Sequence, residues 1–321
     1  MKAEPSLEDI RQAHERIRPF VHRTPVLTSS TINRIAGGEI FFKCENFQKA
    51  GAFKIRGACN AVFSLSDDEA KRGMATHSSG NHAAALALAA RWRGVPAYVV
   101  MPETAPHVKK LAVAGYGAEI VFCKPTLEAR ERALAEVVAR TGAVFVHPYN
   151  DLRVITGQGT AAIELCEEVQ NLDLVVVPVG GGGLIAGVAA GLRAAGSRAT
   201  IWGVEPTGAP KLKRSLEAGR RMRLDHTASI ADGLITLSIG AVPFAELTEP
   251  GRVAGVALVD DASLREAMHF LWRECHLAVE ASGAATVAAV RSRAVQVPAR
   301  AAGSTVLIVS GGNVDPALLE D

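Results

Sequence analysis

The sequence has few aromatic residues and almost no net charge, and both shortages exclude classes of function. Phe, Trp and Tyr make up 5% of the 321 residues, which is too few for the stacking surfaces that bind single-stranded nucleic acid. The 35 Lys and Arg residues stand against 33 Asp and Glu residues, for a formal net charge of +2. This balance argues against a dedicated nucleic-acid binder or a polybasic membrane binder.

Paired cysteines, a targeting segment and a long apolar run are also lacking. The five cysteines are scattered without a CxxC pair, which favours a reducing compartment and offers no thiolate metal site. Residues 1–10 are charged and have no apolar targeting core, and no apolar stretch is long enough to span a bilayer. We therefore expect a soluble cytoplasmic protein.

Short apolar runs alternate with amphipathic stretches along most of the chain. Strands are predicted at residues 96–102, 119–123, 143–146, 174–178, 200–204 and 305–309. Helices are predicted at residues 107–114, 127–138, 159–169, 184–192 and 211–218. Continuous apolar strands that alternate with helices predict parallel sheets covered on both faces. Ligand sites in such folds lie at the carboxyl ends of strands, so the loops there are the candidates for function.

One of these loops contains four consecutive glycines. The segment VVVPVGGGGL (residues 175–184) is a predicted strand that runs into the glycines and then into a helix. Glycines let the backbone approach a ligand closely, and a helix N-terminus offers free N–H groups and a positive dipole. The loop lacks the Lys-Ser/Thr ending and the G-x-G-x-x-G spacing of nucleotide loops, so the phosphate of a cofactor fits it better than ATP. The alternative is a tight turn without a ligand.

Two further turns at predicted strand ends carry serine or asparagine. GMATHSSGNH (residues 73–82) has Ser78, Ser79, Gly80 and Asn81 at its apex, where backbone N–H groups could hold a carboxylate. Helix capping is the alternative role for those side chains. In VLIVSGGN (residues 306–313), Ser310 closes a buried strand, and an ordinary turn serine is the alternative.

A single lysine stands in the apolar, glycine-flanked segment AGAFKIRGA (residues 50–58). Burial lowers the pKa of a lysine and makes it a nucleophile or a base, and Schiff-base formation is the characteristic use of such a lysine. The alternative is that Lys54 extends to water. A buried lysine, a phosphate cradle, and serine and asparagine at strand ends together predict a site for pyridoxal phosphate.

Motifs that span nearly the whole chain come one after another in a specific order. They are HRTPV (22–26), KCENFQKAGAFKIRGA (43–58), SSGNH (78–82), VVMP (99–102), a His-Pro pair (147–148), GQGT (157–160), PVGGGGL (178–184), GVEP (203–206), ADG (231–233) and SGGN (310–313). This set resembles the fold-type II pyridoxal-phosphate enzymes of the serine/threonine dehydratase and serine racemase group. The resemblance implies an α/β fold, tryptophan synthase β-like, in which two lobes of parallel-rich twisted sheet are flanked by helices.

The resemblance also implies how the two lobes are made and where the cofactor lies. Residues 1–62 and 147–321 would form a large cofactor-binding domain, and residues 63–146 a small mobile domain. The cofactor would lie in the cleft between them. Relatives of this kind are commonly homodimers, so we expect a homodimer that acts on a small amino acid.

Each part of the cofactor site receives a role from the same resemblance. Lys54 would form the Schiff base, Phe53 would lie beside the ring, Asn81 would bind the pyridine O3′, and Ser310 would face the ring nitrogen. Backbone groups would hold the phosphate and the cofactor edge, namely those of Gly180, Gly181, Gly182, Gly183, Leu184 and Gly233. The substrate carboxylate would bind to Ser78, Ser79, Gly80, Asn81 and His82, with Ser79 on the ring face opposite Lys54.

The implied activity is that of a dehydratase, or ammonia-lyase, which converts a β-hydroxy-α-amino acid such as threonine or serine to a 2-oxo acid and ammonia. Lys54 as a free amine would remove the α-proton, and the β-hydroxyl would leave. Serine racemase, with Ser79 as the opposite-face acid and base, and hydroxyaspartate dehydratase are alternatives on the same scaffold. A non-catalytic binding protein is the alternative from another class, but Lys54 and the glycines are intact.

Several positions depart from the family pattern toward lower polarity. Ala50 and Ala52 stand where relatives usually have hydroxyls, Ala84 replaces a common glutamine, and Ile235 replaces a basic residue. The late family stretch Glu-Pro-Thr/Ser-Gly-Ala reads EASGA (residues 280–284). These changes suggest a substrate side chain less polar than that of serine, such as threonine or phenylserine. Neutral change around the site is the alternative.

A sharper departure concerns a metal site. Metal-dependent relatives carry a pattern like E-P-x-x-A-x-D, and here Glu205 and Ala209 match while Lys211 replaces the aspartate. A divalent cation prefers hard anionic oxygens and is repelled by a nearby ammonium. We therefore predict no metal at these residues and weak or absent activation by divalent cations, with the ammonium near the position of the metal.

Overall fold

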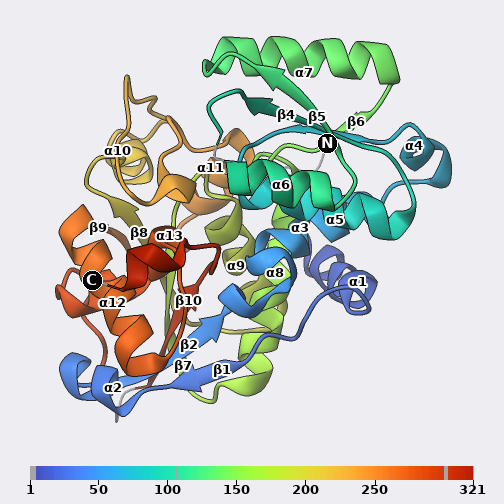
Figure 1. Cartoon of the computed structure of the whole chain (residues 1–321). Coiled ribbons are helices and arrows are strands. Elements are labelled where there is room, and N and C mark those ends of the chain that lie inside the picture. The colour runs from blue at the N-terminus through green and yellow to red at the C-terminus, as the bar shows by residue number, and fades with distance from the viewer. Residues whose placement is uncertain (1–4, 106, 300–302, 321) are drawn as a thin grey trace.

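The computed structural model describes residues 5–105, 107–299 and 303–320 and arranges their strands in two sheets (Figure 1). The larger sheet has the order β1-β2-β10-β7-β8-β9, with β1 (Val26–Thr28), β2 (Glu39–Cys44), β7 (Leu172–Pro178), β8 (Thr200–Pro206), β9 (Gly255–Val259) and β10 (Ser304–Val309). The smaller sheet has the order β5-β4-β3-β6, with β3 (Met74–His77), β4 (Ala97–Pro102), β5 (Glu119–Cys123) and β6 (Val144–Phe145). Strand β1 pairs antiparallel with β2, whereas the other described pairs run parallel.

Helices connect the strands, as the alternating pattern of the sequence predicts. They are α1 (Leu7–Ile17), α2 (Ser30–Ala36), α3 (Lys54–Phe63), α4 (Asp67–Lys71), α5 (Asn81–Arg93), α6 (His107–Gly115), α7 (Leu127–Thr141), α8 (Leu152–Glu168), α9 (Gly183–Ala194), α10 (Lys211–Glu217), α11 (Ala241–Thr248), α12 (Asp261–Cys275) and α13 (Ala281–Arg291). The α/β fold with parallel-rich sheets is confirmed. One predicted start is wrong: the helix expected from residue 159 begins at Leu152, because the carboxylate of Asp151 accepts from the N–H of Arg153 and caps it there.

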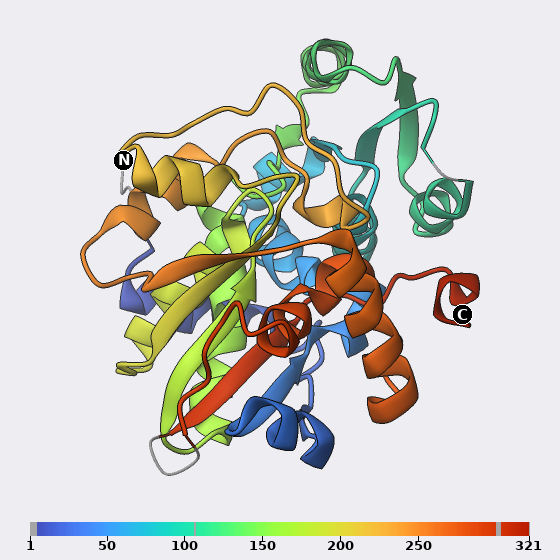
Figure 2. The same ribbon diagram turned by 90° about the vertical axis from the view of Figure 1, so that its left-hand side faces the viewer.

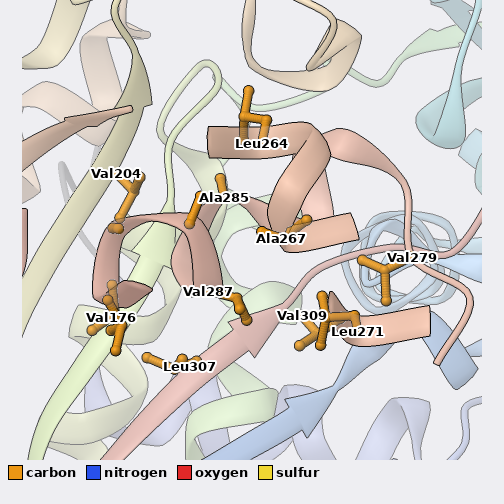
Figure 3. Packing of buried hydrophobic residues seen from close by; sticks show 14 of the residues in the cluster. Val176, Val204, Leu264, Ala267, Leu271, Val279, Ala285, Val287, Leu307 and Val309 are labelled. Atoms are coloured by element: carbon orange, nitrogen blue, oxygen red, sulfur yellow. The ribbon is translucent and has the colours of Figure 1, made fainter. Parts of the chain in front are cut away.

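The larger sheet buries both of its faces. Successive residues of β7 alternate between two apolar clusters: Leu174 and Val176 face one, whereas Val175 and Val177 face the other. Helices α12 and α13 supply much of the first cluster, and Figure 3 shows their side chains packed against the strands. Helices α8 and α9 supply much of the second. Burial on both faces accounts for the continuous apolar strands of the sequence.

The helices behind the second face pack very closely because glycines stand at their contacts. A Cβ on Gly157 of α8 would lie 2.5 Å from the carbonyl oxygen of Arg56 in α3. A Cβ on Gly159 would lie 2.6 Å from the carbonyl oxygen of Gly187 in α9. The glycines that weaken α8 as an isolated helix therefore allow α3, α8 and α9 to approach one another.

A fully buried ion network fixes helix α3. The guanidinium of Arg56 contacts Glu45 at 2.8 Å and Glu164 at 2.7 Å, and the amine of Lys43 contacts Glu164 at 2.7 Å. Burial disfavours the carboxylate form of Glu164, but the two cations outweigh burial and lower its pKa. Since Arg56 is two residues from Lys54, the network holds the first turn of the helix that carries that lysine.

The smaller sheet is covered by its own helices and lies apart from the larger sheet in both views (Figures 1 and 2). In β4, Val100 packs with residues of α7, whereas Val99 and Met101 pack with residues of α5 and α6. Its strands fall within residues 74–145, inside the segment predicted as a small domain. The exact boundaries and the mobility of that domain stay predictions.

Within the described residues, no helix is both long enough and apolar enough to cross a membrane. Residues 1–4 of the charged N-terminal stretch lie outside the described part.

Candidate active site

Lys54 lies between the two sheets, next to the carboxyl end of β10. The segment before it pairs with the residues that come after β10: Ala52 forms a bridge with Gly311, and the N–H of Phe53 donates to the carbonyl oxygen of Ser310 at 3.1 Å. Phe53 precedes the helix, and Lys54 is the first residue of α3. The glycine-flanked segment therefore starts a helix at this lysine.

The amine of Lys54 has a lowered pKa, which favours its uncharged, basic form. Its Nζ donates to the carbonyl oxygen of Pro148 at 2.9 Å and lies 5.1 Å from the ring centroid of Phe53. Burial lowers the pKa of Lys54 to about 8, although the nearby carboxyl of Glu280 acts to raise it. About half of the amine is therefore uncharged at pH 8, where an ordinary lysine is almost entirely charged.

The four glycines lie at the carboxyl end of β7, close to this lysine. Gly182, in a left-handed conformation with φ 92°, stands immediately before helix α9 and provides no side-chain cap. A Cβ on Gly180 would lie 2.5 Å from the carbonyl oxygen of Gly233, and a Cβ on Gly181 would lie 2.2 Å from the ring of Tyr149. Glycine is thus required at these positions, and the N–H groups of the first turn of α9 have no acceptor within the helix.

Ser310 and Gly233 join the same site through a third residue. The N–H of Gly233 donates to the hydroxyl of Ser282 at 2.9 Å, and the hydroxyl of Ser310 donates to the carbonyl oxygen of Ser282 at 3.4 Å. Gly233 also packs against Gly180. The contacts therefore form a continuous path from the glycines through Gly233 and Ser282 to Ser310, whose carbonyl oxygen accepts from Phe53, the neighbour of Lys54.

Asn81 lies on the side of the site that faces the smaller sheet. It is the first residue of α5, and its Nδ2 donates to Oε1 of Glu280 at 2.7 Å. Its Oδ1 accepts from Nδ2 of Asn313 at 2.9 Å. Burial and the charge of Asp232 raise the pKa of Glu280 to about 8, against the hydrogen bond from Asn81. The sequence singled out Glu280 only as the first residue of the EASGA stretch. Its contact with Asn81 was not predicted, since nothing near Glu280 in the chain marks its partner.

The predicted carboxylate turn connects β3 to α5, as the sequence indicates. Ser78, Ser79 and Gly80 are all partly exposed, and the hydroxyl of Ser78 accepts from the N–H of Gly80 at 3.4 Å. His82 is buried with its Nε2 3.3 Å from the carbonyl oxygen of Val146, and burial lowers its pKa well below the usual value. His82 is therefore neutral. The positions of Ser79 opposite the ring and of His82 at the substrate stay predictions.

A row of aromatic rings beside the site was also missed. His147 lies 4.5 Å from Tyr149 and 6.0 Å from His77, measured between ring centroids. Burial lowers the pKa of His147 to about 4, so the ring is uncharged at neutral pH. Burial, with a smaller contribution from the charge of Arg130 in α7, lowers the pKa of His77. The Nε of Arg130 is buried without a hydrogen-bond partner among the described residues. The His-Pro pair at residues 147–148 is the one sequence signal that pointed here.

The three residues of the expected metal pattern lie together near Val179, the residue before the glycine loop: Glu205, Ala209 and Lys211. The Nζ of Lys211 is 3.0 Å from Oε1 of Glu205 and 3.2 Å from the carbonyl oxygen of Ala209. Across the described residues, no group of three or more His, Cys, Asp and Glu side chains is arranged to hold a metal ion. The predicted weakness of divalent activation stays a prediction.

The site as a whole suits a phosphate-bearing aldehyde. Uncovered N–H groups at the start of α9 match a phosphate, and an amine of lowered pKa matches a carbonyl carbon that it can attack. The hydroxyl of Ser310 and the amide of Asn81 lie at the other edges, where they can hold a polar ring.

Comparisons with known proteins agree with this geometry. A family model described as "Pyridoxal-phosphate dependent enzyme" matches residues 17–311. The chain is 44% identical to a serine racemase of Dictyostelium discoideum, over 97% of this chain and 95% of that protein. It is 46% identical to a beta-hydroxyaspartate dehydratase of Paracoccus denitrificans (strain Pd 1222), over 97% of both chains. A crystal structure of the threonine deaminase of T.th. superposes with a TM-score of 0.90 at 41% identity, covering 97% of this chain and 99% of that one.

Proposed function

The chain belongs to the family of pyridoxal-phosphate-dependent enzymes, and we propose that it is a dehydratase that converts a β-hydroxy-α-amino acid to a 2-oxo acid and ammonia. One observation carries the proposal above the others: Lys54, with the pKa of its amine lowered to about 8, is joined through Phe53 to Ser310 and from there by a continuous path of contacts to the glycine loop. Relatives named as dehydratase and deaminase support the reaction class.

The described residues divide the cofactor among them. Lys54 would bind its aldehyde carbon, the loop of Gly180, Gly181, Gly182 and Gly183 with Leu184 its phosphate, and Phe53, Asn81, Gly233 and Ser310 its ring. Bound pyridoxal phosphate withdraws electrons from the α-carbon of the amino acid attached to it. Ser310 is a neutral partner for the ring nitrogen, so it does not enforce a positive charge there and keeps this withdrawal moderate. Moderate withdrawal favours prompt loss of a β-substituent.

Lys54 then carries the proton chemistry. With its amine free, Lys54 would accept the α-proton of the bound substrate at Nζ. The bond from the β-carbon to the hydroxyl breaks, and the hydroxyl leaves with a proton as water. Hydrolysis of the resulting enamine product uses one water and gives a 2-oxo acid and ammonia. The β-hydroxy amino acid is thus converted without any external oxidant or reductant.

Residues of the turn before α5 would position the substrate. Backbone N–H groups of Ser79, Gly80 and Asn81 lie at the start of a helix, where a carboxylate is stabilised, whereas that of Ser78 donates to the carbonyl oxygen of Val100 at 3.2 Å. His82 follows in the first turn of the helix, and its neutral ring places no charge beside the bound carboxylate.

Racemisation at the α-carbon is the second candidate, favoured by the relative named serine racemase. It needs an acid on the ring face opposite Lys54, and Ser79 is the residue in the turn that could supply one. Both reactions begin with removal of the α-proton and differ only in the later steps, which are loss of the hydroxyl or return of a proton. Chiral analysis of recovered substrate separates them.

The side chain of the preferred substrate is a further part of the proposal. Ala84 packs in an apolar cluster and Ala52 is 1% exposed, which is consistent with a site drier than one lined by hydroxyls. We expect a threonine-like or phenylserine-like substrate to be preferred over serine. His147, Tyr149 and Arg130 supply polar groups nearby, and a preference for hydroxyaspartate would show that these dominate.

A substrate panel tests the function. Purified enzyme is given serine, threonine, hydroxyaspartate and phenylserine in both enantiomers, and the 2-oxo acid and ammonia are measured. We expect turnover of at least one β-hydroxy amino acid, and none with Lys54→Ala. Loss of the visible absorption of the cofactor in Lys54→Ala shows that the lysine bears it. If no member of the panel yields a 2-oxo acid, the proposal is contradicted.

The proposal also covers the assembly of the protein and the compartment in which it works. The five cysteines are all free, which supports a reducing compartment such as the cytoplasm. The homodimer rests on the family resemblance. Light scattering of the holoenzyme measures the assembly, and a monomer mass would contradict it.

A further inference from the structure

Lys211 is a fully buried lysine whose ammonium is surrounded by oxygen atoms. Its side chain is 0% exposed. Its Nζ lies 2.9 Å from the carbonyl oxygen of Val179, 2.9 Å from that of Leu234, 3.2 Å from that of Ala209 and 3.0 Å from Oε1 of Glu205. Burying a charged group is costly unless polar partners surround it. The carboxylate and three carbonyl oxygens around this lysine therefore form a specific cation site.

The number of acceptors indicates that the amine is charged. A neutral amine has two N–H donors and an ammonium has three, so four oxygen atoms within 3.2 Å suit the ammonium better. Burial lowers the pKa of Lys211 below its usual value, although the charge and hydrogen bond of Glu205 act to raise it.

Glu205 is itself held in place from two sides. Besides contacting Lys211, its carboxylate accepts from the N–H of Leu212 at 2.8 Å and from that of Lys213 at 3.0 Å. It therefore caps helix α10, whose N-cap residue Pro210 makes no side-chain bond. The carboxylate and the ammonium are fixed by the same turn of helix.

The carbonyl partners belong to both halves of the cofactor site. Val179 immediately precedes the glycine loop, and Leu234 ends the short helix at residues 232–234 that contains Gly233. These two segments also touch directly, because a Cβ on Gly180 would lie 2.5 Å from the carbonyl oxygen of Gly233. The ammonium thus links the segment that would hold the phosphate to the segment that would hold the cofactor edge.

We propose that Lys211 is an internal cation that sets the spacing between the glycine loop and the Gly233 turn, so that the cofactor is retained without a divalent metal. The oxygen atoms around Nζ are the hard ligands that Mg²⁺ or Ca²⁺ would need, and the ammonium occupies their centre. Lys211 is a positioning residue: it acts on the cofactor through the backbone carbonyls of Val179 and Leu234.

The inference rests on the bound cofactor and not on the reaction, so it is tested without substrate. Lys211→Met keeps most of the side-chain volume but removes the charge, and Lys213→Met is the control, since Lys213 is a more exposed lysine two residues later that pairs with Glu217. The dissociation rate of pyridoxal phosphate is measured on the holoenzyme, and the melting temperature on the cofactor-free protein. We expect Lys211→Met to release pyridoxal phosphate about tenfold faster or more, and Lys213→Met to release it at the wild-type rate.

A second variant separates a cation role from a merely structural one. Lys211→Asp removes the ammonium and adds a carboxylate to the same oxygen atoms. Mg²⁺ or Ca²⁺ should therefore raise the melting temperature of Lys211→Asp and slow its release of pyridoxal phosphate, while leaving both unchanged in the wild type. EDTA should also leave the wild-type protein unchanged.

Three results would overturn the inference. One is a Lys211→Met variant that melts earlier but releases the cofactor at the wild-type rate, since Lys211 would then be structural only. Another is a Lys211→Asp variant that ignores both metals. The third needs no variant: cofactor release from the wild type that speeds up with EDTA and slows with Mg²⁺ would mean that a metal, not Lys211, supplies the charge. None of these results would affect the proposed dehydratase reaction.

Discussion

The amide of Asn81 donates a 2.7 Å hydrogen bond to the carboxyl of Glu280, across 199 positions of sequence. Asn81 begins α5, which packs on the smaller sheet, whereas Glu280 precedes α13, which packs on the larger one. This bond joins the two sheets directly beside Lys54, and the charge of Glu280 acts on that lysine. The protonation of Glu280 is therefore coupled both to the contact between the sheets and to the basicity of Lys54.

The first prediction concerns the protonation of Glu280. Its pKa rises from 4.5 to about 8 in the folded protein, so between these pH values the folded state binds a proton that the unfolded state releases. Stability from this group is present below pH 4.5 and is lost as the pH rises through 8, by at most about 1.4 kcal/mol per pH unit. Glu280→Gln keeps an oxygen acceptor for Asn81 and should flatten this slope. Calorimetry of the cofactor-free protein at several pH values checks it, and identical slopes for both proteins would show that Glu280 does not titrate there.

The second prediction concerns the amine of Lys54. Only the uncharged amine attacks the aldehyde of pyridoxal phosphate, so the rate at which cofactor-free protein captures the cofactor should rise with pH and level off above about 8. Stopped-flow absorbance measures this rate. Continued increase toward the ordinary lysine pKa of 10.5 would contradict the proposed effect of burial.

The third prediction concerns the glycine loop. Gly180→Ala places a Cβ 2.5 Å from the carbonyl oxygen of Gly233, and backbone on both sides must move to relieve the contact. We expect the affinity for pyridoxal phosphate to fall by about tenfold or more, a loss of about 1.4 kcal/mol. Gly115→Ala is the matched control, because nothing lies within 4 Å of a Cβ there. Equal affinities for the two variants, measured by cofactor titration, would argue against close packing of the loop.

The fourth prediction concerns stability. Arg56→Met leaves the buried carboxylates of Glu45 and Glu164 without their main partner, so the free energy of unfolding should fall by about 3–5 kcal/mol. Arg18→Met removes an exposed partner of Glu15 and should change it by less than about 0.5 kcal/mol. Urea denaturation of the cofactor-free protein compares them. A small effect of Arg56→Met would mean that water or a rearranged Lys43 replaces the guanidinium.

Local patterns in the sequence predicted the parts of the site that depend on neighbouring residues. The glycine loop after β7 and the serine-rich turn before α5 were both predicted from a strand followed by turn residues. Lys54 was singled out because a charge in an apolar segment is unusual. The pattern did not show that α3 begins at that lysine, because its start depends on pairing with residues after β10.

Partners distant in the sequence could not be predicted from it. Glu280 meets Asn81, and Lys54 meets Pro148, only because two sheets with separate strands come together. The surroundings of Lys211 depend in the same way on oxygen atoms from separate segments. The sequence pointed to Lys211 only as a lysine in place of an acidic residue, and the carbonyls of Val179 and Leu234 required the structure.

The fate of the substrate tests the central claim most directly. The enzyme is incubated with one stereoisomer of its best β-hydroxy amino acid until half is consumed, and the 2-oxo acid, ammonia and both α-carbon configurations of the remaining substrate are measured. A dehydratase that uses Lys54 as its base should give one 2-oxo acid and one ammonia for each substrate lost, with the remaining substrate still a single stereoisomer. Accumulation of the isomer inverted at the α-carbon with little 2-oxo acid would contradict this account and identify a racemase.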